Sequence, residues 1–196
     1  MLAEPAPGLY RWTARHPAWE AGAEPGSPGD WPAEVGCAAY AAPEALVLVD
    51  PLVAGWEALD ALVERHGKPV AVLTTMRFHG RSRAEVAERY GATLVSHRDE
   101  PPEGVRRIPV ERADESMVWL EAAGALVPGD RLLGDGAGGL RMCPESWLGY
   151  LPDPPALDVL REALRPLLEL PVERVLVSHG EPVLRDGRAA LRAALG

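Results

Sequence analysis

Three short polar segments of the sequence each follow an apolar run and carry a side chain that can bind a metal ion. The first, TTMRFHG, holds His79; the second, RLLGDGAGG, holds Asp135; the third, VLVSHGEP, holds His179. In α/β sheets, ligands gather at the carboxyl ends of strands. Two histidines and one carboxylate on different strands can form a facial triad, which suits Zn or non-haem Fe(II). The pattern therefore predicts one divalent metal ion held by His79, Asp135 and His179.

The segment that carries His79 is also rich in arginine. Arg77 and Arg81 lie two residues on either side of the histidine, just before an expected helix N-terminus. Guanidinium groups and the N–H groups of a helix N-terminus both bind phosphate and carboxylate. A second interpretation is therefore a metal-free cleft in which Arg77 and Arg81 bind a small anionic ligand.

A third interpretation gives the same residues only structural roles. His79 lies just before a helix and can cap it. Asp135 lies in a glycine-rich turn and can accept hydrogen bonds from nearby backbone N–H groups. His179, next to Gly180, can be a hydrogen-bonded residue without a catalytic role. Under this interpretation the protein holds no metal.

The remaining histidines and the two cysteines are weaker candidates. His66 lies in a last helical turn, where a cation suits the helix dipole, and His16 and His97 are expected to be exposed. Cys37 lies within a strand pattern and is expected to be a small core residue. Cys143 follows the glycine-rich turn and could act as a nucleophile only with a base such as His179.

Strands and helices alternate in the first half of the chain. Apolar runs predict strands at residues 35–41, 45–49, 70–73 and 93–96, and helical spacing predicts helices at 55–66 and 82–90. Ser82 and Glu85 fit a capping box, in which both side chains satisfy free N–H groups at the start of the second helix. The β-α-β-α-β order of the last three strands favours parallel pairing.

The second half is richer in short strands. These are expected at 107–110, 117–120, 125–127, 131–133 and 174–177, with helices at 156–170 and 188–195. Pro166 should end or kink the first of these helices. Two halves that each combine a sheet with helices indicate an α/β (α+β) protein with two sheets packed face to face and helices outside.

Composition limits the classes of function. The 196 residues suffice for a single domain, given a prior of ~150 residues per domain, with residues 1–34 as an N-terminal arm and loop. A net charge of −9 argues against a nucleic-acid or anionic-membrane partner. No export signal is evident at the N-terminus, so we expect free thiols and a cytoplasmic location. A small-molecule ligand remains the expected partner, and the oligomeric state is left open.

The order of these elements resembles the metallo-β-lactamase fold, a four-layered αββα sandwich of metal-dependent hydrolases. The resemblance rests on LVLVDP (46–51), the strand–turn–helix at 70–90, ALVPGDRLLGDG (125–136) and VLVSHGEP (175–182). It implies that Asp50 supports the site, that Asp135 is the carboxylate shared by two metals, and that His179 is a metal-bound histidine.

The opening motif of the family is missing from this chain. The family has H-x-H-x-D-H, whereas residues 74–79 read TTMRFH. Counted back from the helix, His79 takes the place of the last histidine and Phe78 that of the aspartate; counted forward from the strand, Arg81 takes the place of the last histidine. Under either count, the donors for a metal pair are lost.

The sequence therefore predicts a degenerate member of this fold with at most one metal. As a hydrolase it would use a metal-bound water on a small ester, lactone, thioester or phosphoester. The alternative is a non-catalytic protein that binds a small anion in the vestigial cleft.

Overall fold

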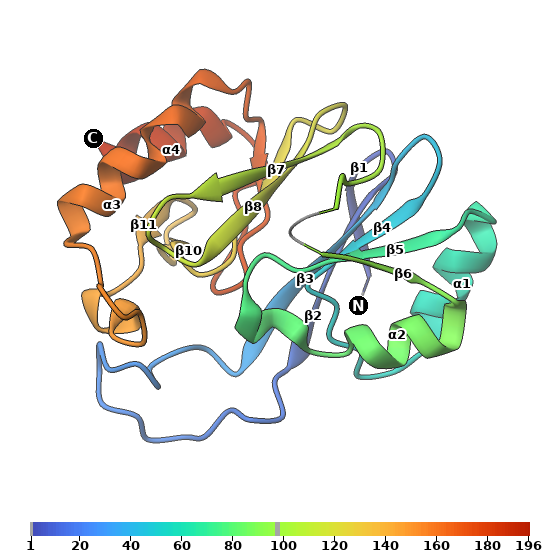
Figure 1. Ribbon diagram of the computed structural model, residues 1–196, viewed down its shortest axis with the longest axis horizontal. Helices are drawn as coiled ribbons and strands as arrows, with labels where there is room; N and C mark the ends of the chain where they lie inside the picture. The colour runs from blue at the N-terminus through green and yellow to red at the C-terminus, as the bar shows by residue number, and fades with distance from the viewer. Residues whose placement is uncertain (1, 97–98) are drawn as a thin grey trace.

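The computed structural model describes residues 2–96 and 99–196; His97, expected to be exposed, lies outside these ranges. Twelve strands and four α-helices form two halves in the described part of the chain, with the first half at the right of Figure 1 and the second at the left. No helix among the described residues is long and apolar enough to span a membrane.

The first half contains a six-stranded sheet with the strand order β1-β2-β3-β4-β5-β6. Its strands are β1 (Ala3–Ala6), β2 (Leu9–Arg15), β3 (Glu34–Ala41), β4 (Leu46–Val49), β5 (Val70–Leu73) and β6 (Thr93–Val95). Strands β1 to β4 pair antiparallel, and β4, β5 and β6 pair parallel, as the βαβαβ order predicts. The segment predicted as an arm thus contributes two strands to the edge of this sheet.

Helices α1 (Glu57–His66) and α2 (Arg83–Tyr90) cover the outer face of the first sheet. Leu59 and Leu62 of α1 and Val86 of α2 share an apolar cluster with Leu46 and Leu48 of β4. Because side chains alternate along a strand, Val47 and Val49 point to the opposite face. Gly67 ends α1 in the left-handed conformation, at φ 59°, as its predicted role of C-cap requires.

The second half contains a four-stranded sheet with the order β12-β9-β8-β7 and a hairpin of β10 and β11. These strands are β7 (Val105–Val110), β8 (Glu115–Leu120), β9 (Ala125–Val127), β10 (Leu132–Gly134), β11 (Leu140–Met142) and β12 (Arg174–Val175). Strand β12 pairs parallel with β9, whereas β7, β8 and β9 pair antiparallel.

Helices α3 (Leu157–Leu164) and α4 (Gly187–Leu195) cover the outer face of this second sheet (Figure 1). Leu160 of α3 and Leu191 of α4 share a cluster with Trp119, Leu126 and Val175 of the sheet. The α-helix gives way at Arg165 to a 3₁₀ turn, η3 (Arg165–Glu169), which fits the helix-breaking effect of Pro166.

A third apolar cluster fills the space between the two sheets. Val47 and Val49 of β4 pack there with Val118, Leu120 and Val127 of the opposite sheet. Helices, sheet, sheet and helices therefore follow one another through the molecule. The predicted four-layered αββα sandwich is confirmed.

The predicted capping box at the start of α2 does not form. Ser82 occupies the N-cap position, but no side chain caps the helix there. Its buried hydroxyl instead accepts a hydrogen bond from the N–H of Val53, at 3.1 Å. The hydroxyl of Ser82 therefore ties the loop after β4 to the start of α2, and Glu85 lies exposed on the helix surface.

Candidate metal centre

Two histidines and one aspartate from different loops meet between the two halves of the molecule. His79 lies in the 3₁₀ turn η1 (Arg77–Gly80), Asp130 follows β9, and His179 follows β12. Nε2 of His79 lies 3.1 Å, and Nε2 of His179 3.3 Å, from Oδ1 of Asp130. The possible ligand atoms of all three residues lie within 4.8 Å of one another.

Asp50 fixes the orientation of His79 by contacting the ring nitrogen that does not face Asp130. This buried carboxylate directly follows β4 and accepts hydrogen bonds from the N–H of Thr75 at 2.8 Å and from the hydroxyl of Thr75 at 2.6 Å. Nδ1 of His79 lies 2.8 Å from Oδ2 of Asp50. Because this contact uses the Nδ1 proton of the imidazole, Nε2 is the atom that faces Asp130.

Glu115 fixes the loop that carries Asp130. This buried carboxylate at the start of β8 accepts hydrogen bonds from three consecutive backbone N–H groups, those of Gly129 at 3.0 Å, Asp130 at 2.8 Å and Arg131 at 3.0 Å. A Cβ atom at Gly129 would lie 2.9 Å from Oε2 of Glu115 and from Oγ1 of Thr75. Glycine is therefore required for this close approach.

Backbone contacts and two indole rings hold His179. Its carbonyl oxygen accepts a hydrogen bond from the N–H of Gly134, at 3.0 Å. The next residue, Gly180, has φ 85° and passes so close to Gly134 that a Cβ would lie 2.9 Å from that residue's carbonyl oxygen. The imidazole packs edge-on against Trp31 and Trp147, with centroids 5.8 and 5.4 Å away.

The buried charges of the cluster stabilise one another. Burial alone would lower the pKa of His79, but the carboxylates of Asp50 and Asp130 outweigh it and raise this pKa to about 9. Burial would raise the pKa of Asp130, yet the two histidines hold it well below its usual value. Burial lowers the pKa of His179. In the absence of a metal, His79 is thus the protonated member of the cluster at neutral pH.

The structure places Asp130, and not Asp135, with the histidines. Oδ1 of Asp135 accepts hydrogen bonds from the N–H groups of Ala137 at 2.7 Å and Gly139 at 2.8 Å, and its side chain is exposed. The candidate metal cluster of the described residues therefore contains Asp130, where the sequence predicted Asp135. Asp135 has instead the structural role of closing its glycine-rich turn.

The pairing of strands in the structure distinguishes Asp130 from Asp135. The chain contains three Gly-Asp pairs, at residues 29–30, 129–130 and 134–135. Of these three, the pair at 129–130 closely follows a strand, β9, that pairs parallel with the strand before His179. The carboxyl ends of parallel neighbours meet at one edge of a sheet. Asp135 follows β10, which pairs with β11 in a separate two-stranded hairpin.

The two arginines predicted to bind an anion already have partners. Nη1 of Arg81 donates to the carbonyl oxygens of Gly36 and Asp50, each at 2.8 Å, and Nη2 donates to the hydroxyl of Ser178 at 2.6 Å. Nε of Arg77 lies 3.2 Å from a carboxylate oxygen of Asp114. Arg81 thus joins the two sheets structurally.

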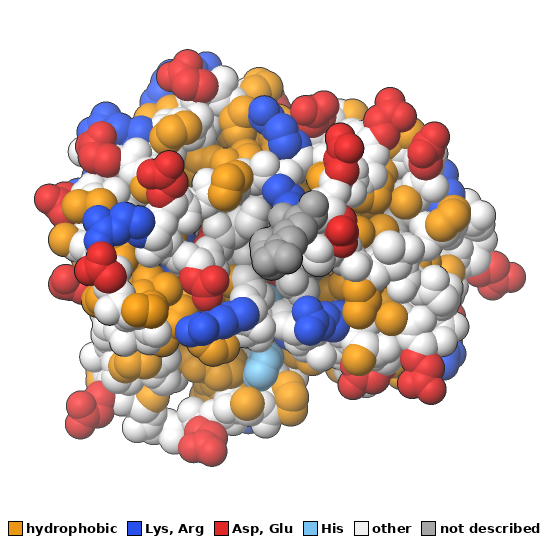
Figure 2. All heavy atoms as spheres, in the orientation of Figure 1, with side chains coloured by type: hydrophobic (Ala, Val, Ile, Leu, Met, Phe, Trp, Pro, Cys, Tyr) orange, Lys and Arg blue, Asp and Glu red, His pale blue; other side chains and the backbone are white. Residues whose placement is uncertain are grey.

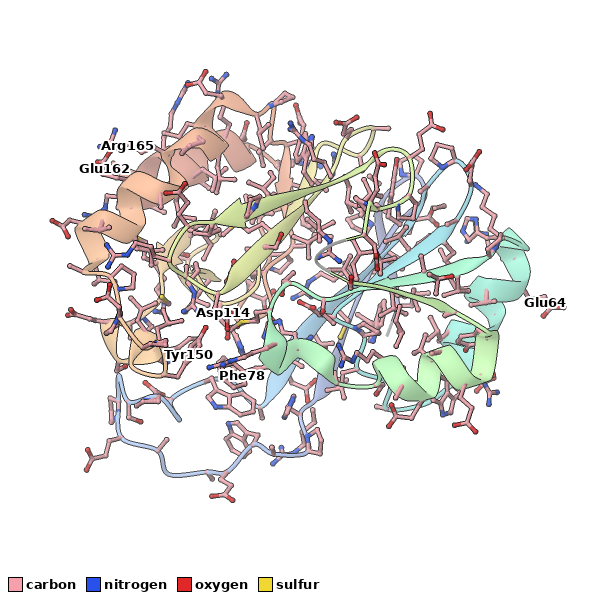
Figure 3. All side chains as sticks on the ribbon, in the orientation of Figure 1. Glu64, Phe78, Asp114, Tyr150, Glu162 and Arg165 are labelled. Atoms are coloured by element: carbon pink, nitrogen blue, oxygen red, sulfur yellow. The ribbon has the colours of Figure 1, made fainter. Side chains whose placement is uncertain are left out.

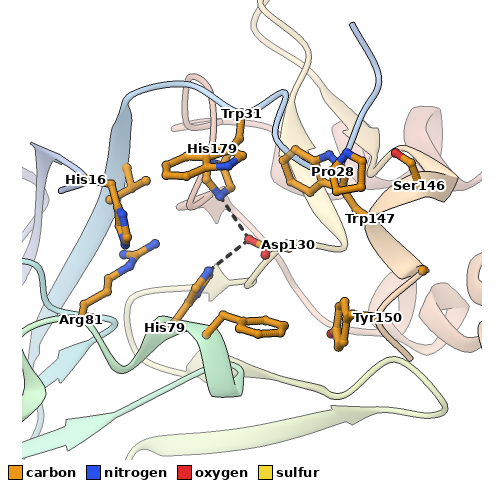
Figure 4. Close-up of a pocket in the computed structure, with 13 residues that line it drawn as sticks. His16, Pro28, Trp31, His79, Arg81, Asp130, Ser146, Trp147, Tyr150 and His179 are labelled. Atoms are coloured by element: carbon orange, nitrogen blue, oxygen red, sulfur yellow. Dashed lines mark ion pairs between the residues drawn. The ribbon is translucent and has the colours of Figure 1, made fainter. Parts of the chain in front are cut away.

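A cavity of about 590 Å³ opens beside the cluster. His79, Asp130 and His179 line it together with several aromatic side chains (Figure 4). His16, expected to be exposed, is half-buried and lines this cavity. Figure 2 shows hydrophobic side chains and a histidine grouped below the centre of one face of the molecule, with most acidic side chains nearer the rim.

The two cysteines do not take part in the cluster. Cys37 and Cys143 are both buried free thiols, and burial raises the pKa of each. Nη1 of Arg131 contacts the sulfur of Cys143 at 3.8 Å. A raised pKa disfavours the thiolate form that a nucleophilic cysteine needs.

Solved structures with the same arrangement identify the fold. The DIM-1 metallo-β-lactamase exposed to ceftazidime matches with a TM-score of 0.63 at 12% identity, over 98% of this chain and 96% of that chain. A metallo-β-lactamase from Erythrobacter litoralis matches with a TM-score of 0.60 at 15% identity, over 99% and 89%. This chain has the metallo-β-lactamase fold.

A metallo-β-lactamase family protein from Thermus thermophilus shares the metallo-β-lactamase fold with this chain, with a TM-score of 0.52 at 17% identity over 96% of this chain and 78% of that chain. No protein-family model and no curated protein matches the sequence. At sequence identities this low, the structural similarity establishes only the fold. The activity therefore has to be argued from the residues of the site.

Proposed function

We propose that this protein is a hydrolase of the metallo-β-lactamase fold that uses one divalent metal ion, Zn or Fe, bound by His79, Asp130 and His179. The observation that carries the proposal is the convergence of two imidazole nitrogens on one carboxylate oxygen, at 3.1 and 3.3 Å. Tetrahedral ligands with bonds of ~2.0–2.2 Å lie ~3.3–3.6 Å apart, which is close to these separations.

The donor atoms have the chemistry that a metal requires. Oδ1 of Asp130 is buried and makes no hydrogen bond within the described part of the chain, although it lies between the two imidazoles. Asp50 holds the Nδ1 proton of His79, which is the usual way in which a carboxylate fixes the metal-binding form of a histidine. A metal ion would replace the second proton of His79, on Nε2.

A single metal fits these residues better than a pair. The described residues contain one cluster of three or more possible ligands, and Thr74, Met76 and Phe78 stand where the family motif has metal-binding side chains. A metallo-β-lactamase of the same fold from Erythrobacter litoralis is known in a mono-zinc form, with a TM-score of 0.59 at 14% identity.

The metal, when bound, would supply a nucleophilic hydroxide near neutral pH and polarise the substrate's carbonyl or phosphoryl oxygen. The chain itself would contribute three ligands, the tautomer of His79 and a cavity lined largely by aromatic side chains. A small ester, lactone, thioester or phosphoester would suit this chemistry. A cytoplasmic location remains a prediction.

The alternative of a non-catalytic anion-binding protein has less support. It requires Arg77 and Arg81 to bind the ligand, but Arg77 is paired with Asp114, and both terminal nitrogens of Arg81 already donate to protein oxygens. An anion would have to compete with these internal partners.

Elemental analysis of the untagged protein tests the proposal. We expect about one equivalent of metal after incubation with Zn²⁺, Fe²⁺ or Mn²⁺. Asp130→Ala should lose this metal because it removes the central ligand. Asp135→Ala is the matched control, an exposed aspartate in the same region that should keep it.

Metal-free wild-type protein under every condition would contradict the proposal, and so would equal metal content in the two variants. The cluster would then be an internal ion pair, with a protonated His79 between Asp50 and Asp130. If metal is present, the same preparations should be assayed on the four substrate classes, with Asp130→Ala as the inactive reference.

A further inference from the structure

The cavity beside the metal centre has a predominantly aromatic wall. Trp31 and Trp147 lie on one side of Asp130 and Tyr150 on the opposite side (Figure 4). Phe78 packs edge-on against Tyr150, with centroids 4.8 Å apart, and the two lie next to each other in Figure 3. Flat rings on both sides of one space favour a flat apolar occupant.

Internal hydrogen bonds hold one side of this cavity in place. Nε1 of Trp147 donates to the carbonyl oxygen of Ser27 at 3.1 Å, and Nε1 of Trp19 donates to that of Trp31 at 2.8 Å. The hydroxyl of Ser146 also bonds to the carbonyl oxygen of Gly26. The loop between β2 and β3 is thereby attached to the turn η2 (Glu145–Leu148), so the cavity is formed before any ligand enters.

The cavity wall offers an anion no available arginine. Arg81 is the only arginine or lysine among the described residues that line it, and its terminal nitrogens are directed at Gly36, Asp50 and Ser178. Arg77 stacks on Phe78 and Tyr150 at 4.7 and 4.8 Å and pairs with Asp114. Arg77 therefore stabilises the aromatic rim and is not among the residues that line the cavity.

We propose that this cavity binds an uncharged aryl group, and that the substrate is an aryl-bearing ester, thioester or lactone in place of a charged phosphoester. A volume of about 590 Å³ is within the usual range for sites that hold small organic ligands. The statement about the reactive bond rests on the proposed hydrolase function, whereas the binding of the aryl group requires no metal.

Calorimetric titration with a matched pair of probes tests the inference. 2-Naphthol is an uncharged aryl compound, and 2-naphthoate carries a carboxylate on the same rings. On chelator-treated protein we expect 2-naphthol to bind saturably and at least about 10-fold more tightly than 2-naphthoate, because the carboxylate finds no free cation.

The variant Phe78→Ala locates the binding site. Phe78 is 55% exposed, so its removal should leave the fold intact, and we expect it to weaken 2-naphthol binding by about 3- to 10-fold through loss of one ring contact. Leu184→Ala is the matched control: Leu184 is also a half-exposed apolar residue, but it does not line the cavity, and its loss should leave binding unchanged.

Failure of the inference can be told apart from failure of the proposed function. No saturable binding of 2-naphthol, equal binding of the two probes, or undiminished binding in Phe78→Ala would each overturn the inference. The metal content of the same protein after incubation with Zn²⁺, Fe²⁺ or Mn²⁺ and before chelator treatment, measured separately, decides the metal site. If the protein binds 2-naphthol but takes up no metal, the inference about the cavity is supported and the proposed hydrolase function is contradicted.

Discussion

At the scale of single residues, the candidate centre depends on carboxylates that hold histidines. His79 lies between two of them: Asp50 contacts Nδ1 at 2.8 Å, and Asp130 lies 3.1 Å from Nε2. The first contact fixes the ring, and the second places the ring beside a carboxylate that also lies 3.3 Å from Nε2 of His179. Asp50 is thus a positioning residue that acts through His79.

Substitution of Asp50 by asparagine should weaken metal binding without removing a ligand. Loss of the carboxylate that orients a metal-bound histidine typically lowers metal affinity by about 10–100-fold. Competition with a chromogenic chelator measures the affinity of Asp50→Asn against wild type.

The exposed carboxylate Asp60 provides the control for this experiment. It belongs to α1 and binds Arg89 at 2.7 Å, so Asp60→Asn removes the same charge without touching His79. Similar affinities for wild type and both variants would mean that Asp50 has no influence on the centre.

At the scale of elements, the loop after β9 depends on the strand beside it. The carboxylate of Glu115 in β8 accepts hydrogen bonds from three backbone N–H groups of this loop. Its Oε2 lies 3.6 Å from Nε of the fully buried Arg131. Arg131 in turn donates to the hydroxyl of Tyr150 at 2.6 Å. One buried carboxylate therefore connects the loop that carries Asp130 with the aromatic wall of the cavity.

We expect Glu115→Ala to destabilise the protein by about 3–5 kcal/mol, because it leaves a buried arginine and three N–H groups without their partner. Urea unfolding measures this change. The metal content of the folded fraction should also fall, because the loop that carries Asp130 loses its anchor.

Glu121→Ala serves as the comparison. Glu121 follows the same strand, β8, but is exposed and makes a long ion pair with Arg106, at 4.0 Å. Its removal should change stability by less than about 1 kcal/mol. Equal effects of the two variants would refute the anchoring role of Glu115.

At the scale of the whole molecule, the centre lies where the two halves meet. His79 comes from the first half, and Asp130 and His179 come from the second. Arg81 crosses the same boundary, because it binds the carbonyl oxygens of Gly36 and Asp50 and the hydroxyl of Ser178. The packing of the two sheets and the geometry of the site are therefore coupled.

Removal of the Arg81 side chain should destabilise the whole fold. Arg81→Ala loses three hydrogen bonds from a charged donor, and we expect a loss of about 2–4 kcal/mol by urea unfolding. Arg83→Ala, an exposed arginine two residues away, should have little effect. If phosphate instead stabilised wild type but not Arg81→Ala, Arg81 would bind anions. The proposal that Arg81 serves to join the two sheets would then be wrong.

Local patterns in the sequence determined most of the fold. The strand at Val70–Leu73, the helix ending at His66 with Gly67 as its cap, and the break near Pro166 all follow from apolar spacing and from backbone preferences. Strands Ala3–Ala6 and Leu140–Met142 were not predicted, since both are short and are stabilised by neighbouring strands.

The site itself needed the tertiary structure. Sequence identified His79 and His179, because each follows an apolar strand, and it suggested the support by Asp50 through the family resemblance. It led to Asp135 and not to Asp130, although both residues follow a glycine. It also gave no indication that the side chains of Glu115 and Arg81 bind other parts of the protein. The choice depends on which strands are neighbours in space, and contacts between residues far apart in the chain leave no local signal in the sequence.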